Sequence, residues 1–267
     1  MALSDNTRLE DPWMAHALDV IRKNYSTDAS AVAKGKDLLK FGANKLVGTT
    51  AASLQIQPAG ILHESYVSSN LINSIVSTDS GDTEVVGVEG HTSSDGLTFA
   101  FSTQDITLTG QTAVALTTPL ARVTRVYNKA GTELAGTVSV TETDTYSSGV
   151  PDTASKVHLQ ISAGEQNSDK AATTLSSTDY WIVTGFSGSV LEKTSVSAEV
   201  DLQVRCAGEV FRVVARVSTS NAHNAVYNFL PYRVIQPNSD IRLVAVASGA
   251  NTEVSGTIQG VLATTAT

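Results

Sequence analysis

The alternation of apolar and polar residues along the C-terminal part of the chain predicts consecutive β-strands. In residues 196–205 every second residue is apolar, and the residues between them are polar or charged. The same period of two recurs in residues 211–217, 240–245 and 253–262. A strand that buries one face and exposes the other has this period. Several such strands at short spacing are typical of an antiparallel β-sandwich of the jelly-roll or immunoglobulin-like kind.

The first two of these runs are expected to form a hairpin around Ala207-Gly208. A two-residue turn at this point fixes the register of the two strands. In that register Leu202 faces Val213 inside the sandwich. Outside, the expected cross-strand pairs are Glu199 with Arg216 and Gln203 with Arg212.

The middle of the chain also has the pattern of short β-strands. They are separated by turn-forming residues such as Asp95-Gly96 and Thr109-Gly110. The expected strands cover residues 53–57, 83–89, 98–108, 111–117, 121–127, 137–140 and 156–162. The chain is therefore mainly β, as one large or two smaller domains.

The N-terminal residues follow a helical pattern instead. Asp11-Pro12 is typical of a helix start, and Trp13, Leu18 and Ile21 then lie on one apolar stripe. A second helix is expected over residues 29–40, with Gly42 as its C-terminal stop. This arm is too short to form its own core, so it packs either on its own β body or on a partner. The expected division is a helical arm (1–45), a β-rich domain (46–165) and a C-terminal β-sandwich (166–267). If the arm docks on a partner, its removal is expected to leave the β body folded.

The charge and composition narrow the function. The chain of 267 residues has a net charge of −8, and the acidic excess lies after residue 45. A nucleic-acid binder would need a basic surface, so we expect none. No apolar run approaches the ~20 residues that a membrane helix needs, and no secretory signal is expected. The single cysteine, Cys206, excludes an intrachain disulfide.

The sequence offers no strong catalytic constellation, so we expect no enzyme, no cofactor and no metal. The five histidines are scattered, and no nucleophile elbow or phosphate-binding loop is present. The best acid–base candidate is Glu89 and His91 with Asp95, at an expected strand end. Asp79 and Asp82 could hold Ca²⁺ in a turn, although such aspartates usually cap their own backbone.

The strand arginines are expected to be solvated or paired on the strand faces, without forming a ligand clamp. They are Arg122, Arg125, Arg212, Arg216 and Arg242. Tyr180 and Trp181 are the adjacent aromatic pair that a carbohydrate-binding β-sandwich could present. The apolar neighbours of Trp181 favour a place in the core.

Two stretches of the chain resemble a known class of proteins. Residues 87–128 contain VEGHTSSDGLTFAFSTQDITLTGQTAVALTTPLARVTRVYN, and the closing stretch reads FLPYRVIQPNSDIRLVAVASGANTEVSGTIQGVLA. Both are similar to the β-rich virion structural proteins of tailed bacteriophages, marine and cyanobacterial ones in particular. The resemblance covers most of the chain and leaves out the arm. It implies a non-enzymatic, oligomeric component located in the virion.

Because of this resemblance, our leading interpretation is a capsid decoration (cement) protein. Its expected partners are the major capsid protein or other virion proteins. A homotrimer is the assembly that the resemblance implies. The alternatives are a head–tail, collar or fibre-anchoring protein, and a carbohydrate-binding β-sandwich. The arm offers Trp13, Leu18 and Ile21 as interface residues. The final strand, expected at a sheet edge, adds Val261 to an apolar patch with Val244 and Val246.

Overall fold

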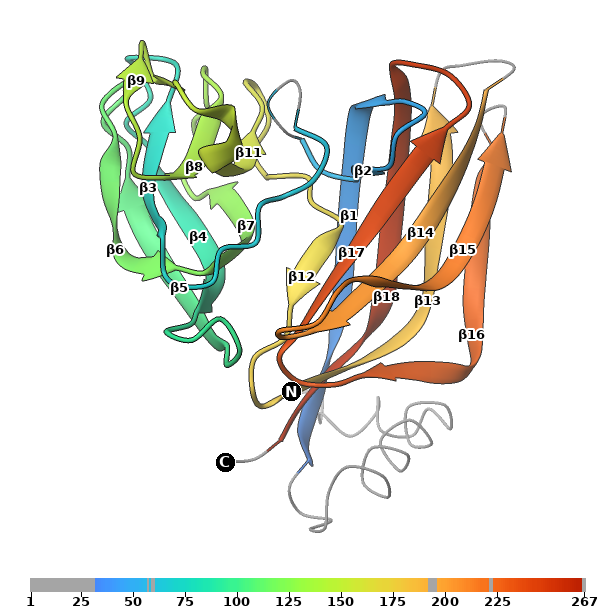
Figure 1. Cartoon of the computed structure of the whole chain (residues 1–267). Helices are drawn as coiled ribbons and strands as arrows, with labels where there is room; N and C mark the ends of the chain where they lie inside the picture. Colours follow the sequence, from blue (N-terminus) through green and yellow to red (C-terminus); the bar gives the residue numbers. More distant parts are fainter. Residues whose placement is uncertain (1–31, 57, 59–60, 192–195, 221–222, 266–267) are drawn as a thin grey trace, which may run out of the picture.

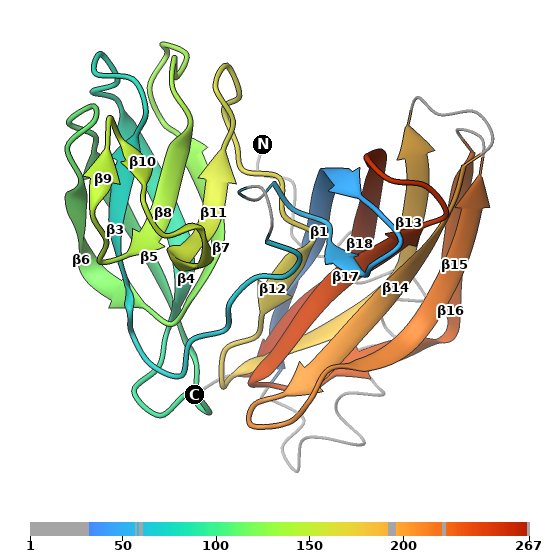
Figure 2. The same cartoon turned by 45° about the horizontal axis from the view of Figure 1, so that its top comes forward.

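The chain folds into two antiparallel β-sandwiches that lie side by side (Figures 1 and 2). The structure is a computed structural model, and it describes residues 32–56, 58, 61–191, 196–220 and 223–265. The expected mainly β sandwich fold is confirmed. The expected helix with Trp13, Leu18 and Ile21 lies outside the described residues. Within the described residues, no helix is long and apolar enough to cross a membrane.

The large sandwich is built from both ends of the chain. Its sheet I has the order β1 (Val32–Val47), β18 (Thr252–Thr265), β13 (Asp179–Leu191) and β16 (Asn224–Ile235). Its sheet II has the order β12 (Ala172–Thr174), β17 (Ser239–Ala247), β14 (Ser197–Cys206) and β15 (Arg212–Ser220). The short β2 (Ala52–Ser53) also pairs with β17.

The small sandwich is inserted between β2 and β12. One sheet has the order β11 (Val157–Ile161), β8 (Val138–Glu142), β3 (Ile72–Ser77) and β6 (Val114–Leu120). The other has the order β5 (Ala100–Thr107), β4 (Val85–Thr92) and β7 (Arg122–Asn128). A hairpin of β9 (Tyr146–Ser147) and β10 (Val150–Pro151) and a 3-10 turn, η2 (Ala154–Lys156), complete it.

Each sandwich has its own apolar core, and the two cores share no residue. Trp181 and Phe186 of β13 are fully buried at the centre of the large core. Ile75 of β3 and Val88 of β4 are fully buried in the small core. The core position expected for Trp181 is therefore confirmed, and its ring is not available to a ligand.

The second expected helix is wrong, because residues 32–47 form strand β1. This strand pairs antiparallel with β18 from Val32 opposite Thr265 to Val47 opposite Thr252. Lys, Leu and Ala favour a helix locally, but hydrogen bonding to a strand more than 200 residues away outweighs that weak preference. Gly42 is not a helix stop. It lets β1 pass close to Leu54, since an added Cβ would meet the Leu54 carbonyl oxygen.

Residues 32–45 of the expected arm therefore lie in the same sheet as the C-terminal strands, and β18 is central rather than at an edge. The boundaries at residues 45 and 165 remain predictions about where independent domains begin and end.

The expected register of the β14–β15 hairpin is also wrong, although the expected pair of Glu199 and Arg216 forms an ion pair at 2.9 Å. Asp201 faces Arg216 and Leu202 faces Ala215, and a bulge then places Gln203 opposite Val213. The loop between the strands is longer than two residues. The extra residue of the bulge reverses the alternation on β15, so that Val213 is 51% exposed.

Candidate functional site

A buried ionic cluster joins the two sandwiches. Asp240 of β17, which is fully buried, accepts hydrogen bonds from Arg122 Nε of β7 (3.0 Å) and Arg205 Nε of β14 (2.8 Å). It also accepts one from the Thr174 hydroxyl (2.6 Å). Both guanidinium groups lie over the Tyr66 ring, at 5.0 Å and 4.2 Å from its centroid. Burial alone would raise the pKa of Asp240, but the two arginines outweigh it and hold that pKa below its usual value.

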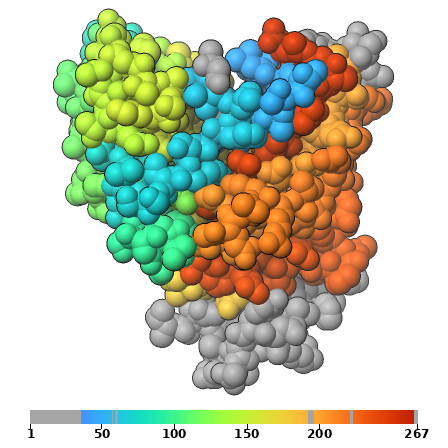
Figure 3. Space-filling view, in the orientation of Figure 1, coloured from blue at the N-terminus to red at the C-terminus, as the bar shows by residue number. Residues whose placement is uncertain are grey.

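A second buried ion pair lies between the segments that link the sandwiches. Lys170, before β12, donates to Glu64 (2.5 Å), which lies between β2 and β3. Lys170 Nζ also donates to the Val123 carbonyl of β7 (2.6 Å). Burial lowers the pKa of Lys170, and the negative charge of Glu64 opposes that change. On the face shown in Figure 3, the segment after β2 (blue to cyan) covers the surface between the sandwiches. The buried charges of Asp240 and Lys170 are thus paired, since an unpaired buried charge would be strongly unfavourable.

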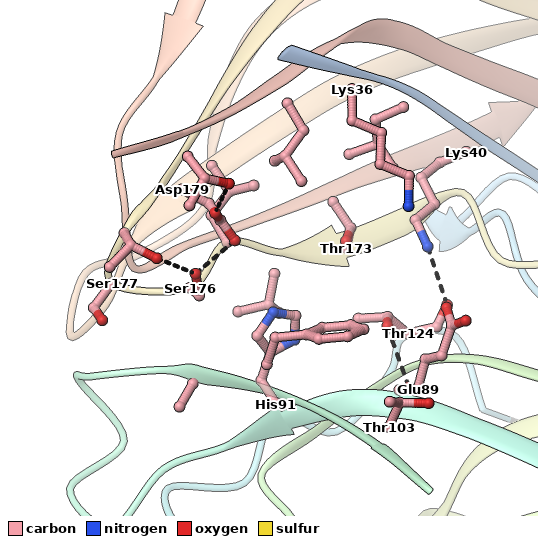
Figure 4. A pocket seen from close by; sticks show the side chains of 18 residues that line it. Lys36, Lys40, Glu89, His91, Thr103, Thr124, Thr173, Ser176, Ser177 and Asp179 are labelled. Carbon is pink, nitrogen blue, oxygen red and sulfur yellow. Dashed lines mark hydrogen bonds between the residues drawn. The ribbon is translucent and has the colours of Figure 1, made fainter. Parts of the chain in front are cut away.

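A cleft of about 690 Å³ opens beside this cluster. Strands β1 and β18 and residues 173–179 of the large sandwich form one wall, and β4, β5 and β7 of the small sandwich form the other. In Figure 4, Lys36 and Lys40 extend from one wall, while Glu89 and His91 extend from the opposite wall. The volume lies in the range of ~300–1,000 Å³ that is usual for ligand pockets.

His91 is the most unusual group of the cleft. Its side chain is 3% exposed, and its Nδ1 has no hydrogen-bond partner among the described residues. Burial lowers the pKa of His91 to about 4, so the ring is neutral at pH 7. The ring lies edge-on to that of Phe101, at 5.6 Å between centroids. Phe101 is 55% exposed, and it lines the cleft.

The lysine side of the cleft carries excess positive charge. Lys40 is half-buried and donates to the Thr124 carbonyl at 3.5 Å. Burial lowers the pKa of Lys40 to about 8; Glu89 opposes this effect, and Lys170, Arg125 and Lys36 add to it. At pH 7 the amino group is therefore still mostly protonated.

The opposite end of the cleft is lined by hydroxyl groups. The carboxylate of Asp179 accepts hydrogen bonds from the Ser176 hydroxyl (2.5 Å) and the Thr264 hydroxyl (2.7 Å). These residues and the neighbouring Thr173 line the cleft together. This end can exchange hydrogen bonds with a polar ligand.

The structure separates the acid–base candidates of the sequence. Glu89 and His91 lie two residues apart on β4 and both line the cleft. Asp95 instead accepts hydrogen bonds from the backbone of Leu97 and Thr98 in its own turn, at 2.8 Å each. Mainly these hydrogen bonds lower the pKa of Asp95 to about 2. Asp95 is thus a turn residue and not a partner of His91 in the cleft.

The two aspartates considered for Ca²⁺ bind the protein's own groups. Asp82 is buried and accepts hydrogen bonds from the backbone of Ala135 (2.9 Å) and Gly136 (3.0 Å). Asp79 accepts one from the backbone of Gly81 (2.7 Å). No group of three or more His, Cys, Asp or Glu residues suited to a metal occurs in the part of the chain that is described.

The apolar patch expected from three valines does not form. Val244 is 2% exposed and pairs with β2 on sheet II, and Val246 is half-buried on the same strand. Val261 is half-buried on sheet I and packs with Ile182. The patch fails because β17 and β18 belong to different sheets of the sandwich.

No family model matches this chain, and no curated protein matches it. Among the solved structures that are weakly similar to it are two from infectious bursal disease virus. The structure of infectious bursal disease virus Gt strain has a TM-score of 0.21 at 13% identity, and the crystal structure of the infectious bursal disease virus VP2 subviral particle has 0.20 at 12%. Each alignment covers 96% of this chain and 78% of the other. TM-scores this low do not establish a shared fold.

The sequence pattern does not predict most of the cleft. It places Lys36 and Lys40 in a helix, and it gives no functional signal at Phe101 or Asp179. Period-two alternation in residues 36–40 is hidden, because Leu38 faces the core while Leu39 is exposed on the other face. Strand pairing brings these residues opposite His91, and no local signal encodes that pairing.

Proposed function

We propose that this protein is a structural component of a bacteriophage virion, a capsid decoration protein that acts through protein–protein contacts and catalyses no reaction. The similarity of residues 87–128 and of the closing stretch to phage virion proteins supports the class. The two-sandwich architecture is compatible with it, although sandwiches have many roles.

The observation that carries the proposal is a set of exposed apolar residues on the two edge strands of sheet I. The outer face of a sandwich is usually polar. Here Leu39 and Phe41 of β1 are 64% and 45% exposed, and Val226 of β16 is 54% exposed. Phe41 and Val226 lie in one row across the sheet, through Thr257 of β18 and Ser187 of β13. Exposed apolar groups on one face mark a protein interface.

The partner that fits this face is a second copy of the chain. Strands β1 and β16 are the two edges of sheet I among the described strands, and both carry exposed apolar residues. If the β1 edge of one copy contacts the β16 edge of the next, every copy uses two different patches. Such head-to-tail contacts close into a ring when the rotation allows it. The trimer itself comes from the resemblance to phage proteins.

The oligomer can be tested by light scattering of the purified chain. We expect a trimer for the wild type and monomers for Phe41→Glu and for Val226→Glu, because each change places a charge in the contact. Val150→Glu is the matched control, since Val150 is 51% exposed on β10 of the small sandwich. An equimolar mixture of the two single variants should form a dimer, because one intact junction remains. A monomeric wild type, or variants that stay trimeric, would refute the interface.

Attachment to the particle is a separate test. Particles that lack the protein are incubated with the full chain or with residues 32–267, and bound protein is located by electron microscopy. The shorter chain keeps β1 but lacks Trp13, Leu18 and Ile21. We expect it to fold and to bind the shell more weakly. Equal binding would show that the arm is not the attachment site. Binding at the collar or tail would replace the decoration role by the head–tail or fibre-anchoring alternative.

A further inference from the structure

We propose that the cleft between the sandwiches binds an acidic saccharide, meaning a sugar that carries a carboxylate such as a uronic acid. Its walls provide three chemistries side by side: a cationic corner at Lys36 and Lys40, an apolar surface at Phe101, and a row of hydroxyls at residues 173–179. This site is independent of the virion role, and either proposal can fail alone.

The apolar surface suits the C–H face of a sugar ring. Phe101 lies on β5, which is an edge strand of its sheet, and it lines the cleft while 55% of its side chain is exposed. An aromatic ring exposed in a concave, partly polar site contributes contact area with little loss of conformational freedom on binding. One edge of the Phe101 ring contacts the buried His91 ring, at 5.6 Å between centroids.

His91 forms the part of the cleft wall that lies behind Phe101. Its Nδ1 is buried and has no partner among the described residues, and a buried polar atom without a partner is unfavourable. Figure 4 shows the His91 side chain on the small-sandwich wall, facing residues 173–179 across the cleft. Because Nδ1 is closed off from solvent, the ring forms part of the cleft wall behind Phe101 and does not bond the ligand directly.

The cationic corner favours an acidic sugar over a neutral one. Figure 4 shows the amino groups of Lys36 and Lys40 near each other on the same side of the cleft. Glu89 is the acidic residue near them, and it also pairs with Arg125 at 3.8 Å. Glu89 is one acidic group beside two lysines, so one positive charge is left over. Lys36 carries it at the exposed rim, where a ligand carboxylate could pair with it.

Titration calorimetry with trigalacturonate tests the proposal, with neutral galactotriose as the comparison. We expect trigalacturonate to bind and galactotriose to bind more weakly. Phe101→Ala should weaken the binding of both sugars by about five- to tenfold, since an aromatic contact of this kind is worth ~1–1.4 kcal/mol. Leu97→Ala, a 50% exposed residue of the neighbouring turn, is its control and should change neither.

The charge is tested by Lys36→Gln. This variant should weaken the binding of trigalacturonate by about two- to fivefold, because exposed ion pairs contribute no more than ~1 kcal/mol. Its affinity for galactotriose should stay the same. Lys45→Gln is the matched control, because Lys45 is an exposed lysine on the same strand outside the cleft. The absence of trigalacturonate binding at millimolar concentration would overturn the proposal. Binding that Phe101→Ala leaves intact would place the ligand elsewhere. Equal binding of both sugars with no effect of Lys36→Gln would refute the acidic specificity.

Discussion

Replacing Asp240 by asparagine tests whether the buried ionic cluster holds the two sandwiches together. The change keeps the shape of the side chain but removes the negative charge from the cluster. Arg122, which is 4% exposed, and Arg205 would then be left near each other without their counter-ion. Removing one partner of a buried pair costs about 3–5 kcal/mol. This is a large part of the ~5–15 kcal/mol by which folded domains are stable.

Urea unfolding followed by circular dichroism measures this loss. Asp201→Asn is the matched control, because Asp201 lies on the neighbouring strand β14 and pairs with Arg216 through two hydrogen bonds of 2.5 Å and 2.9 Å. The side chain of Arg216 is half exposed, so this control should cost only about 1 kcal/mol or less. If Asp240→Asn costs no more than Asp201→Asn, the cluster is not what joins the sandwiches.

The same cluster sets a pH dependence. The folded pKa of Asp240 lies below that of the unfolded chain, so the folded state binds its proton less readily. The ionised Asp240 therefore stabilises the fold at pH values above its unfolded pKa of ~3.9. This stabilisation is lost as the pH falls through the folded pKa. The wild type should therefore lose stability below about pH 4 more steeply than Asp240→Asn. If the stability of both proteins fell equally steeply below pH 4, Asp240 would not be the group that causes the loss.

Three further outcomes are expected. Leu202→Ala should lower the free energy of unfolding in urea by about 2–5 kcal/mol, because it leaves a cavity in the core. Val213→Ala, on the exposed side of the bulge, should lower it by less than ~1 kcal/mol. Equal losses of stability would contradict the bulge. Because the pKa of His91 falls from ~6.5 to about 4 on folding, the unfolded chain binds its proton first, so stability should decline between pH 6.5 and 4 by up to roughly 3 kcal/mol. His91→Gln should make that decline smaller. A variant that loses as much stability as the wild type between pH 6.5 and 4 would refute the role of His91. A chain that starts at residue 48 lacks β1 and should aggregate in light scattering, because it exposes the edge of β18, whereas residues 32–267 should stay soluble.

The alternation of apolar and polar residues predicts a strand, and which of its faces is buried, wherever that alternation is unbroken within the strand. Residues 196–205 form β14 with Ala198, Val200 and Leu202 in the core, as their spacing predicted. The apolar neighbours of Trp181 predict its place in the core for the same reason. A two-residue period depends only on which face of a strand is buried, and each strand carries that information in its own residues.

The tertiary structure decided which strands pair and what lies between the sandwiches. Residues 32–47 became a strand only because β18 offers a partner at the other end of the chain. The bulge in β15, which turns Val213 outward, interrupts an alternation that the sequence pattern assumes to continue. Arg122 and Asp240 are 118 residues apart, and nothing in the alternation of either strand predicts that they form a buried pair. Long-range pairing of this kind depends on the packing of whole sheets, and the free energy that selects it appears only when both partners are in place.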